Sequence, residues 1–143
     1  MSELRTALLA RLNMLVLGKL HAYERYSRNA TKLADCYQFN GRLEGGFLRR
    51  ITAKVIPGAS LGNRRRESFE LTLLRSFEDA EQSELLFDDS LDRVIAEFEN
   101  SHQLNGWTCA VGEQLGFELT RSAPAMFAGV LVHYAVLRIT FIR

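Results

Sequence analysis

The chain has 143 residues, of which 47% are hydrophobic and 24% charged, and its formal net charge is +1. This balance is typical of one globular domain over residues 1–143 and excludes a disordered chain. No apolar run reaches the ~18 residues of a membrane span. Arg11, Asn13 and Lys19 interrupt the apolar stretch 8–20, which therefore does not match a signal peptide. We expect a protein without a membrane partner that is made and kept in a cytoplasm.

The first element that we expect is a helix over residues 2–20. Ser2 can cap its N-terminus, Glu3 lies in its first turn, and apolar side chains recur at helical spacing. This stripe consists of Leu4, Leu8, Leu12 and Leu15, and it is widened by Leu9, Val16 and Leu17. Two interpretations stay open: the helix is fully buried in the chain's own core, or another chain covers part of it.

Residues 21–32 are polar and basic, and they predict a loop. A short strand is expected over residues 33–39, ending at the turn signal Asn40-Gly41. Gly45-Gly46 is expected to break the chain before a second strand over residues 47–56.

A flexible basic hairpin loop is expected at residues 58–66, after the turn signal Pro57-Gly58. A third strand follows at residues 67–77. Apolar and polar side chains alternate in it, namely Phe69, Leu71 and Leu73 against Ser68, Glu70 and Thr72. Such alternation is typical of a half-buried antiparallel strand.

A second helix is expected over residues 83–101, with Ser83 as its N-cap. Its apolar stripe consists of Phe87, Leu91, Val94, Ile95 and Phe98. Glu84, Asp88 and Asp89 lie near the helix N-terminus, whose partial positive charge stabilises carboxylates.

The remaining sequence predicts strands. After the turn signal Asn105-Gly106, short strands are expected over residues 107–111 and 115–121, with a break at Ala123-Pro124. The strongest strand signal covers residues 129–143, and its expected core face consists of Leu131, Ala135, Leu137, Ile139 and Phe141. The order of elements predicts an α+β fold with an antiparallel or mixed β-sheet, an N-terminal helix and a second helix packed on one face.

No catalytic, metal-binding or cofactor-binding pattern stands out. His21, His102 and His133 are scattered, without HExxH or CxxC spacing, and GxSxG, GxGxxG, GxxxxGK and EF-hand patterns are absent. We therefore expect no enzyme, no cofactor and no metal. A site assembled across subunits, involving His133, Asp88 or Ser83, stays open as the enzymatic alternative.

Cys36 and Cys109 are the two cysteines. One disulfide could join them, but two free thiols fit a reducing compartment better.

Charge is divided unevenly along the chain. Residues 1–75 carry 14 Lys/Arg against 6 Asp/Glu, whereas residues 76–143 carry 4 against 11. Either these are two solvated faces of a domain, or the subunit is dipolar and its basic side meets the acidic side of a neighbour. The candidate contact residues are Arg49, Arg50, Arg64, Arg65, Arg66, Asp79, Glu81, Glu84 and Asp88. Non-specific contact of the basic cluster, which includes Lys54, with DNA is the alternative to a contact with protein.

Three stretches carry a family resemblance: GGFLRRITAKVI, NRRRESFELTLLRSFEDAEQSELLFDDSLDRVIAEF and FAGVLVHYAVLRITFI. Their layout resembles the tail terminator (tail completion) proteins of long-tailed phages, over most of the chain and in pattern rather than in a specific motif. Those proteins have an N-terminal helix, a strand leading into a long hairpin loop, a returning strand, a helix and a C-terminal strand.

The resemblance implies a homo-oligomeric ring, commonly hexameric, at the head-proximal end of the tail tube. Such a ring ends tube polymerisation and provides the joint to head-completion or connector proteins. Tail tube protein and connector are then the partners, and the protein resides in the virion tail or neck after assembly in the host cytoplasm. The resemblance also implies contacts through the hairpin loop, here residues 57–66, and through sheet edges between subunits. The alternative is another phage neck or connector protein, or a tail tube subunit.

Overall fold

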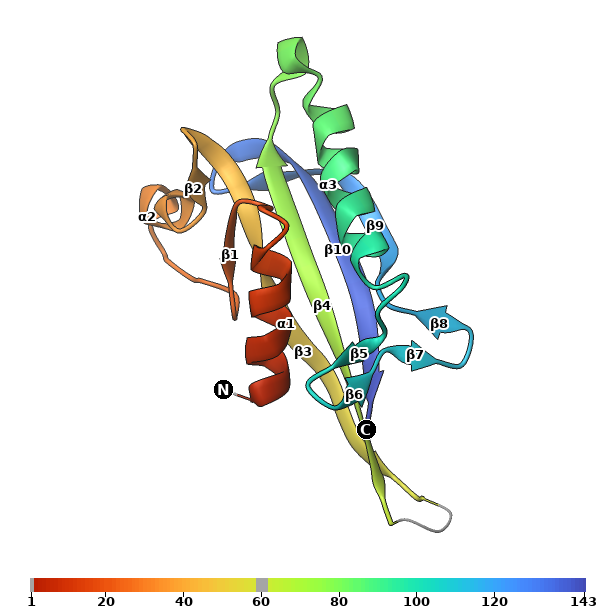
Figure 1. Ribbon diagram of the computed structural model, residues 1–143. Coiled ribbons are helices and arrows are strands. Elements are labelled where there is room, and N and C mark those ends of the chain that lie inside the picture. Colours follow the sequence, from red (N-terminus) through yellow and green to blue (C-terminus); the bar gives the residue numbers. More distant parts are fainter. Residues whose placement is uncertain (1, 59–61) are drawn as a thin grey trace.

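The computed structural model describes residues 2–58 and 62–143, and it contains a large mixed sheet with α1 and α3 on one face (Figure 1). The elements are α1 (Glu3–Asn13), β1 (Lys19–His21), α2 (Ala30–Asp35), β2 (Gln38–Phe39), β3 (Arg42–Ile56), β4 (Arg64–Ser76), the 3₁₀ turn η1 (Asp79–Glu81), α3 (Ser83–Glu97), β5 (Gln103–Leu104), β6 (Trp107–Thr108), β7 (Ala110–Val111), β8 (Gln114–Leu115), β9 (Glu118–Phe127) and β10 (Val130–Ile142). The predicted α+β class, with a mixed sheet, is confirmed.

Three long strands form the centre of the sheet. The sheet order is β1-β3-β4-β10-β6-β5, with β2 also paired to β3 and β9 also paired to β10. β4 is antiparallel to both β3 and β10, whereas β1 is parallel to β3. β4 has 13 residues, so at ~3.3 Å per residue it spans roughly 40 Å. This length sets the long axis of the molecule, with the β3–β4 hairpin at one end and η1 at the other (Figure 1).

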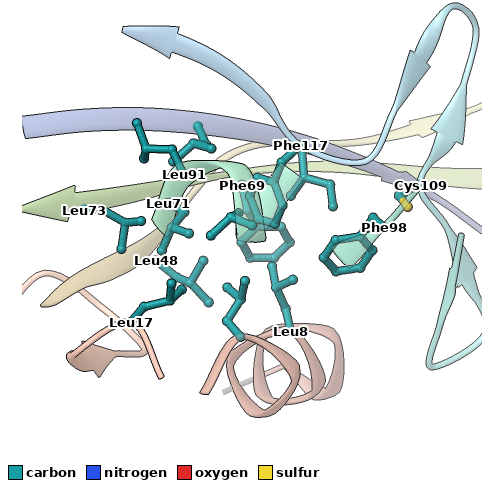
Figure 2. Packing of buried hydrophobic residues seen from close by; sticks show 14 of the residues in the cluster. Leu8, Leu17, Leu48, Phe69, Leu71, Leu73, Leu91, Phe98, Cys109 and Phe117 are labelled. Carbon is teal, nitrogen blue, oxygen red and sulfur yellow. The ribbon is translucent and has the colours of Figure 1, made fainter. Parts of the chain in front are cut away.

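The main core lies between the sheet and the two helices. Figure 2 shows Leu8 of α1 pointing toward Phe69 and Leu48, with Leu91 and Phe98 from the second half of the chain closing the cluster. The buried positions of α1 are Leu4, Leu8 and Leu12, and those of α3 include Phe87, Leu91 and Val94. Each large apolar side chain buried here stabilises the fold by about 1.5–3 kcal/mol. The predicted apolar stripes of both helices are therefore confirmed at their centres.

A smaller cluster covers part of the opposite sheet face, next to α2. It consists of Tyr37, Leu43, Phe47, Leu74 and Val132. The Tyr37 hydroxyl accepts a hydrogen bond from the Arg25 backbone N–H at 3.2 Å, and burial raises the pKa of Tyr37 to about 12. β4 is thus buried on both faces near this end, in contrast to the half-buried strand that was predicted.

The N-terminal helix is shorter than predicted and ends at Asn13 instead of residue 20. Ser2 caps it as expected, because its hydroxyl accepts a hydrogen bond from the Arg5 backbone N–H at 3.2 Å. Val16 and Gly18 have φ of 54° and 102°, which turn the chain into β1. A Cβ at Gly18 would lie 2.3 Å from the Glu44 carbonyl oxygen, so only glycine fits this turn. The chain's own core buries Leu4, Leu8, Leu12 and Leu17 of the predicted stripe, whereas Val16 is 64% exposed.

The predicted loop at residues 21–32 and strand at residues 33–39 were wrong in part. Asn29 is the N-cap of α2, because its side-chain oxygen accepts hydrogen bonds from the backbone N–H groups of Thr31 and Lys32. The strand is reduced to the two residues of β2. A single polar cap followed by six helical residues leaves little periodicity to detect.

The predicted break at Gly45-Gly46 was also wrong, because both glycines lie within β3. A Cβ at Gly45 would lie 2.2 Å from the Lys19 carbonyl oxygen, and one at Gly46 would lie 1.9 Å from that of Thr72. The two glycines therefore allow β1 and β4 to approach β3 closely.

Ser83 is not the N-cap of α3. Gln82, with φ of 56°, precedes the helix and makes no side-chain capping bond. The Ser83 side chain turns inward instead and bonds to the Glu78 backbone N–H and His133. The helix also ends earlier than predicted, at Glu97.

The hairpin and the late strands need further corrections. β4 begins at Arg64, so Arg64, Arg65 and Arg66 belong to a strand instead of the predicted 58–66 loop, of which residues 59–61 lie outside the described residues. Residues 103–115 form two short hairpins, β5–β6 and β7–β8. Pro124 lies within β9, which tolerates it because β9 is an edge strand. Of the predicted β10 core face, only Leu131 is exposed, at 47%.

Candidate assembly surfaces

The contact residues predicted from the sequence form a basic group on β3 and β4 and an acidic group on η1 and α3. Arg64, Arg65 and Arg66 lie at the hairpin end of β4, whereas Arg49 and Arg50 lie opposite Glu70 and Phe69, near its middle. The acidic residues follow the other end of β4, with Asp79 and Glu81 on η1 and Glu84 and Asp88 on α3. Figure 1 shows the β3–β4 hairpin at one end of the sheet and η1 at the other. The three arginines that begin β4 and the carboxylates of η1 therefore lie toward opposite ends of the long axis, although Arg42 and Arg75 also lie toward the η1 end. Whether these residues contact another subunit stays a prediction.

On the helix-bearing face, two of the arginines, Arg50 and Arg65, share one acidic partner. Glu67 has a side chain that is only 5% exposed, and it lies 3.3 Å from Arg50 and 3.6 Å from Arg65. Arg49 forms a looser ion pair with Glu24 at 3.8 Å. Because these arginine side chains are between 44% and 68% exposed, each pair contributes only about 0–1 kcal/mol. Their guanidinium groups remain available to a partner.

The acidic end contains two neighbouring carboxyls, Glu78 and Glu81. Hydrogen bonding of the protonated Glu78 carboxyl to Glu81 raises the pKa of Glu78, with Arg42 and Arg75 opposing this shift. Glu44 in turn lies 2.8 Å from Arg42 and 2.9 Å from Arg75. The exposed carboxylates beyond this network therefore carry the negative charge of this end.

His133 is buried at the same end, between β10 and the start of α3. Its ring stacks on Phe77 with a centroid distance of 3.7 Å, and its Nε2 lies 2.8 Å from the Ser83 hydroxyl. Burial lowers the pKa of His133, an effect that Glu84 and Asp88 oppose. Two cavities of about 180 and 210 Å³ adjoin this histidine.

The structure thus brings together Ser83 and His133, which are 50 residues apart in the sequence. Ser83 is 2% exposed, and its oxygen already accepts the Glu78 backbone N–H at 2.9 Å. A nucleophile needs access to substrate, so this pair is better explained as a bond that ties the η1–α3 turn to β10. The sequence named Ser83 and His133 only as members of a possible site across subunits. It did not predict that they meet within one chain, because nothing in it indicates that the Ser83 side chain turns inward.

The sheet leaves two different edges open. Within the described residues, β9 pairs only with β10, and β3 beyond Phe47 pairs only with β4. Backbone N–H and C=O groups along such edges can pair with another chain. The sequence predicted long edge strands, but it did not show which strands they are.

The β9 edge is partly blocked against strand pairing. Pro124 lacks a backbone N–H, and the register shift between Val136 and Leu137 leaves Thr120 as an extra residue. The Thr120 hydroxyl is bonded to the Val136 carbonyl at 2.9 Å. Beside this edge, Met126 and Leu131 lie opposite each other in register and are 68% and 47% exposed. β9 therefore offers apolar side chains more readily than a continuous ladder of hydrogen bonds.

The β3 edge is more open. After a register shift between Arg50 and Thr52, the strand runs regularly to Ile56. Val55 on this segment is 62% exposed, and no proline interrupts it before residue 57. Long regular edges of this kind are the usual sites of pairing between chains.

The described part of the chain shows no sign of a metal site, a membrane-spanning helix or a disulfide. Among residues 2–58 and 62–143, no three His, Cys, Asp or Glu side chains converge as a metal site would require. None of the helices there combines the length and the apolar character of a bilayer span. Cys36 and Cys109 are both free thiols, as preferred from the sequence, and burial raises the pKa of Cys109.

Comparison with known proteins finds neither a matching family model nor a matching curated protein. The resemblance to tail terminator proteins therefore remains a prediction that rests on the pattern of the sequence.

Proposed function

We propose that this chain is a structural subunit that assembles with copies of itself into a closed ring. The observation that supports this most directly is the pair of open sheet edges, one on β3 and one on β9. The two edges consist of different residues, so a contact that joins one to the other is heterologous. Heterologous contacts repeat head to tail and close into a ring when the rotation between subunits permits it.

The charge along the long axis supports the same proposal. A basic hairpin end and an acidic η1–α3 end would repel like ends and attract unlike ends of neighbouring subunits. Such complementarity selects the head-to-tail orientation more than it adds affinity. The apolar groups beside the edges, Val55, Met126 and Leu131, would supply the buried area.

Together with the sequence resemblance, these surfaces lead us to propose a place for the ring. It would cap the head-proximal end of a phage tail tube, end tube polymerisation and present its other face to head-completion or connector proteins. Tail tube protein and connector would be its partners, and it would have no enzymatic role. A neck protein or a tail tube subunit remains the second candidate, because heterologous contacts that do not close also build tubes.

Electron microscopy of the purified protein, alone and mixed with tail tubes, tests the proposal. We expect rings in the first sample and tubes capped at one end in the second. Filaments formed by the protein alone would favour the tail tube candidate. Isolated monomers that leave both tube ends bare would contradict the proposal.

A further inference from the structure

A cationic cleft lies on the face of the sheet opposite to α1 and α3, near the hairpin. Its volume is about 480 Å³, and the turn between β7 and β8 forms one of its walls. Neighbouring strands contribute three cations and three hydroxyls to its lining: Lys54 and Thr52 from β3, Arg66 and Ser68 from β4, and Arg138 and Thr140 from β10. No carboxylate lines it.

The three cations of the cleft lack the acidic partners that the other face provides. There, Glu67 pairs with Arg50 and Arg65. Within the described residues, none of Lys54, Arg66 and Arg138 has a carboxylate within 4.0 Å. The acidic residues nearest in register, Glu70 and Glu118 opposite Arg138, lie outside the lining.

Arg66 gives this cleft an unused hydrogen-bond donor. Its Nε is buried and has no hydrogen-bond partner within the described residues. Buried donors are nearly always bonded, so an unbonded guanidinium N–H beside a cavity points to a missing acceptor.

The hydroxyls supply a further donor. Ser68 and Thr140 are both buried, and their oxygens lie 2.9 Å apart. Each hydroxyl has one proton, and the bond between them uses only one of the two. The second proton is free to point to an acceptor in the cleft. Cations, a guanidinium donor and a hydroxyl donor thus converge from three adjacent strands.

From this arrangement we propose that the cleft binds a phosphate group. Guanidinium groups bind phosphate oxygens with charge-assisted, often paired hydrogen bonds, and lysine adds a mobile charge. The volume of the cleft accommodates a phosphate together with the group esterified to it. Two sources fit this chemistry, the phosphate of a nucleic acid backbone and free phosphate in solution. The proposal is independent of ring assembly, because each subunit contains the whole cleft.

Backbone amide chemical shifts of the full chain, followed by NMR during titration, test this proposal. The probes are inorganic phosphate and a short oligothymidylate, each against sodium chloride of equal ionic strength. The variants are Arg66→Gln and Arg138→Gln, and their spectra also report whether each variant folds. Arg28→Gln is the matched control, because it removes the same charge from an exposed position outside the cleft.

We expect phosphate to shift the amides around the cleft, and each cleft variant to bind about tenfold more weakly while Arg28→Gln binds as the wild type does. If oligothymidylate binds and free phosphate does not, the ligand is a nucleic acid backbone. In that case each cleft variant makes one fewer phosphate contact. The negative slope of log K for binding against log salt concentration then becomes shallower by about 0.7.

Three results would overturn the proposal. The first is that neither probe shifts the cleft amides, and the second is that Arg28→Gln weakens binding as much as the cleft variants do. The third is that the cleft variants lose self-association although phosphate has no effect on the wild type. The cleft would then hold carboxylates from the acidic end of a second copy.

Discussion

At the scale of single residues, His133 is a titratable group that the fold holds away from water. It is 6% exposed, and it bonds to Ser83 and stacks on Phe77. Burial disfavours the charged imidazolium and lowers the pKa of His133 below its ordinary value of 6.5. The neutral ring therefore holds the start of α3 against β10 at neutral pH.

This pKa shift predicts a pH dependence of stability. Below about pH 6.5 the unfolded chain takes up a proton at His133 more readily than the folded chain. The free energy of unfolding should therefore be intact above that pH and fall as the pH decreases further. Urea denaturation between about pH 7.5 and 5.5 measures this loss.

His133→Gln should reduce that loss. His102→Gln is the matched control, because its ring bonds to the Glu99 carbonyl of its own turn and lies outside the contact of α3 with β10. Identical pH profiles for the wild type and His133→Gln would show that His133 does not titrate differently on folding.

Gly46 is the second residue with a testable role. A Cβ there would lie 1.9 Å from the Thr72 carbonyl oxygen, so Gly46→Ala should force β3 and β4 apart. We expect the free energy of unfolding to fall by about 1–3 kcal/mol, as measured by urea denaturation.

Gly41→Ala is the control, because its Cβ would meet nothing within 4 Å although φ is +78°. It should cost about 1 kcal/mol through backbone strain alone. Equal losses for the two variants would mean that the close contact of β3 with β4 is not required.

At the scale of elements, the sequence predicted what periodicity can report. The stripes of α1 and α3 and the inner face of β10 follow from side chains spaced at 3.6 or 2 residues. The ends of these elements depend on contacts with distant segments. Val16 and Gly18, with positive φ, lead the chain from α1 into β1. Gly45 lies in a strand because β1 and β4 both pair with β3 at this point.

The candidate surfaces were predictable to different degrees for the same reason. The arginines and carboxylates of the two ends are clustered in the sequence, so their grouping could be predicted. The cationic cleft could not, because Arg138 and Thr140 join Arg66 and Ser68 only through the pairing of β10 with β4.

The β3 edge makes a prediction of its own. Val55→Lys places a charge on the open, regular part of this edge, and lysine on an edge strand opposes pairing with another chain. We expect assembly to weaken about tenfold or more, which corresponds to about 1.4 kcal/mol, while circular dichroism remains that of the wild type. Light scattering at several protein concentrations measures the change.

Val16→Lys is the matched control, because Val16 is 64% exposed but lies in the turn after α1. If both variants assemble as the wild type does, the β3 edge is not part of the interface.

At the scale of the whole molecule, shape and charge follow the same axis. β4 connects the basic hairpin to the acidic η1–α3 end across the sheet (Figure 1). An assembly stabilised by contacts between such ends should be sensitive to salt, because screening shortens from about 10 Å at 0.1 M to about 3 Å at 1 M ionic strength. Contacts between apolar side chains at the edges should be much less affected by this screening.

Sedimentation velocity of the purified protein tests the central claim, which is that copies of this chain complete each other's open edges. We expect one species with the mass of a closed oligomer, constant over a range of protein concentrations, which dissociates partly when the salt is raised. A species with the mass of one chain at every concentration, in low salt as in high, would contradict the account.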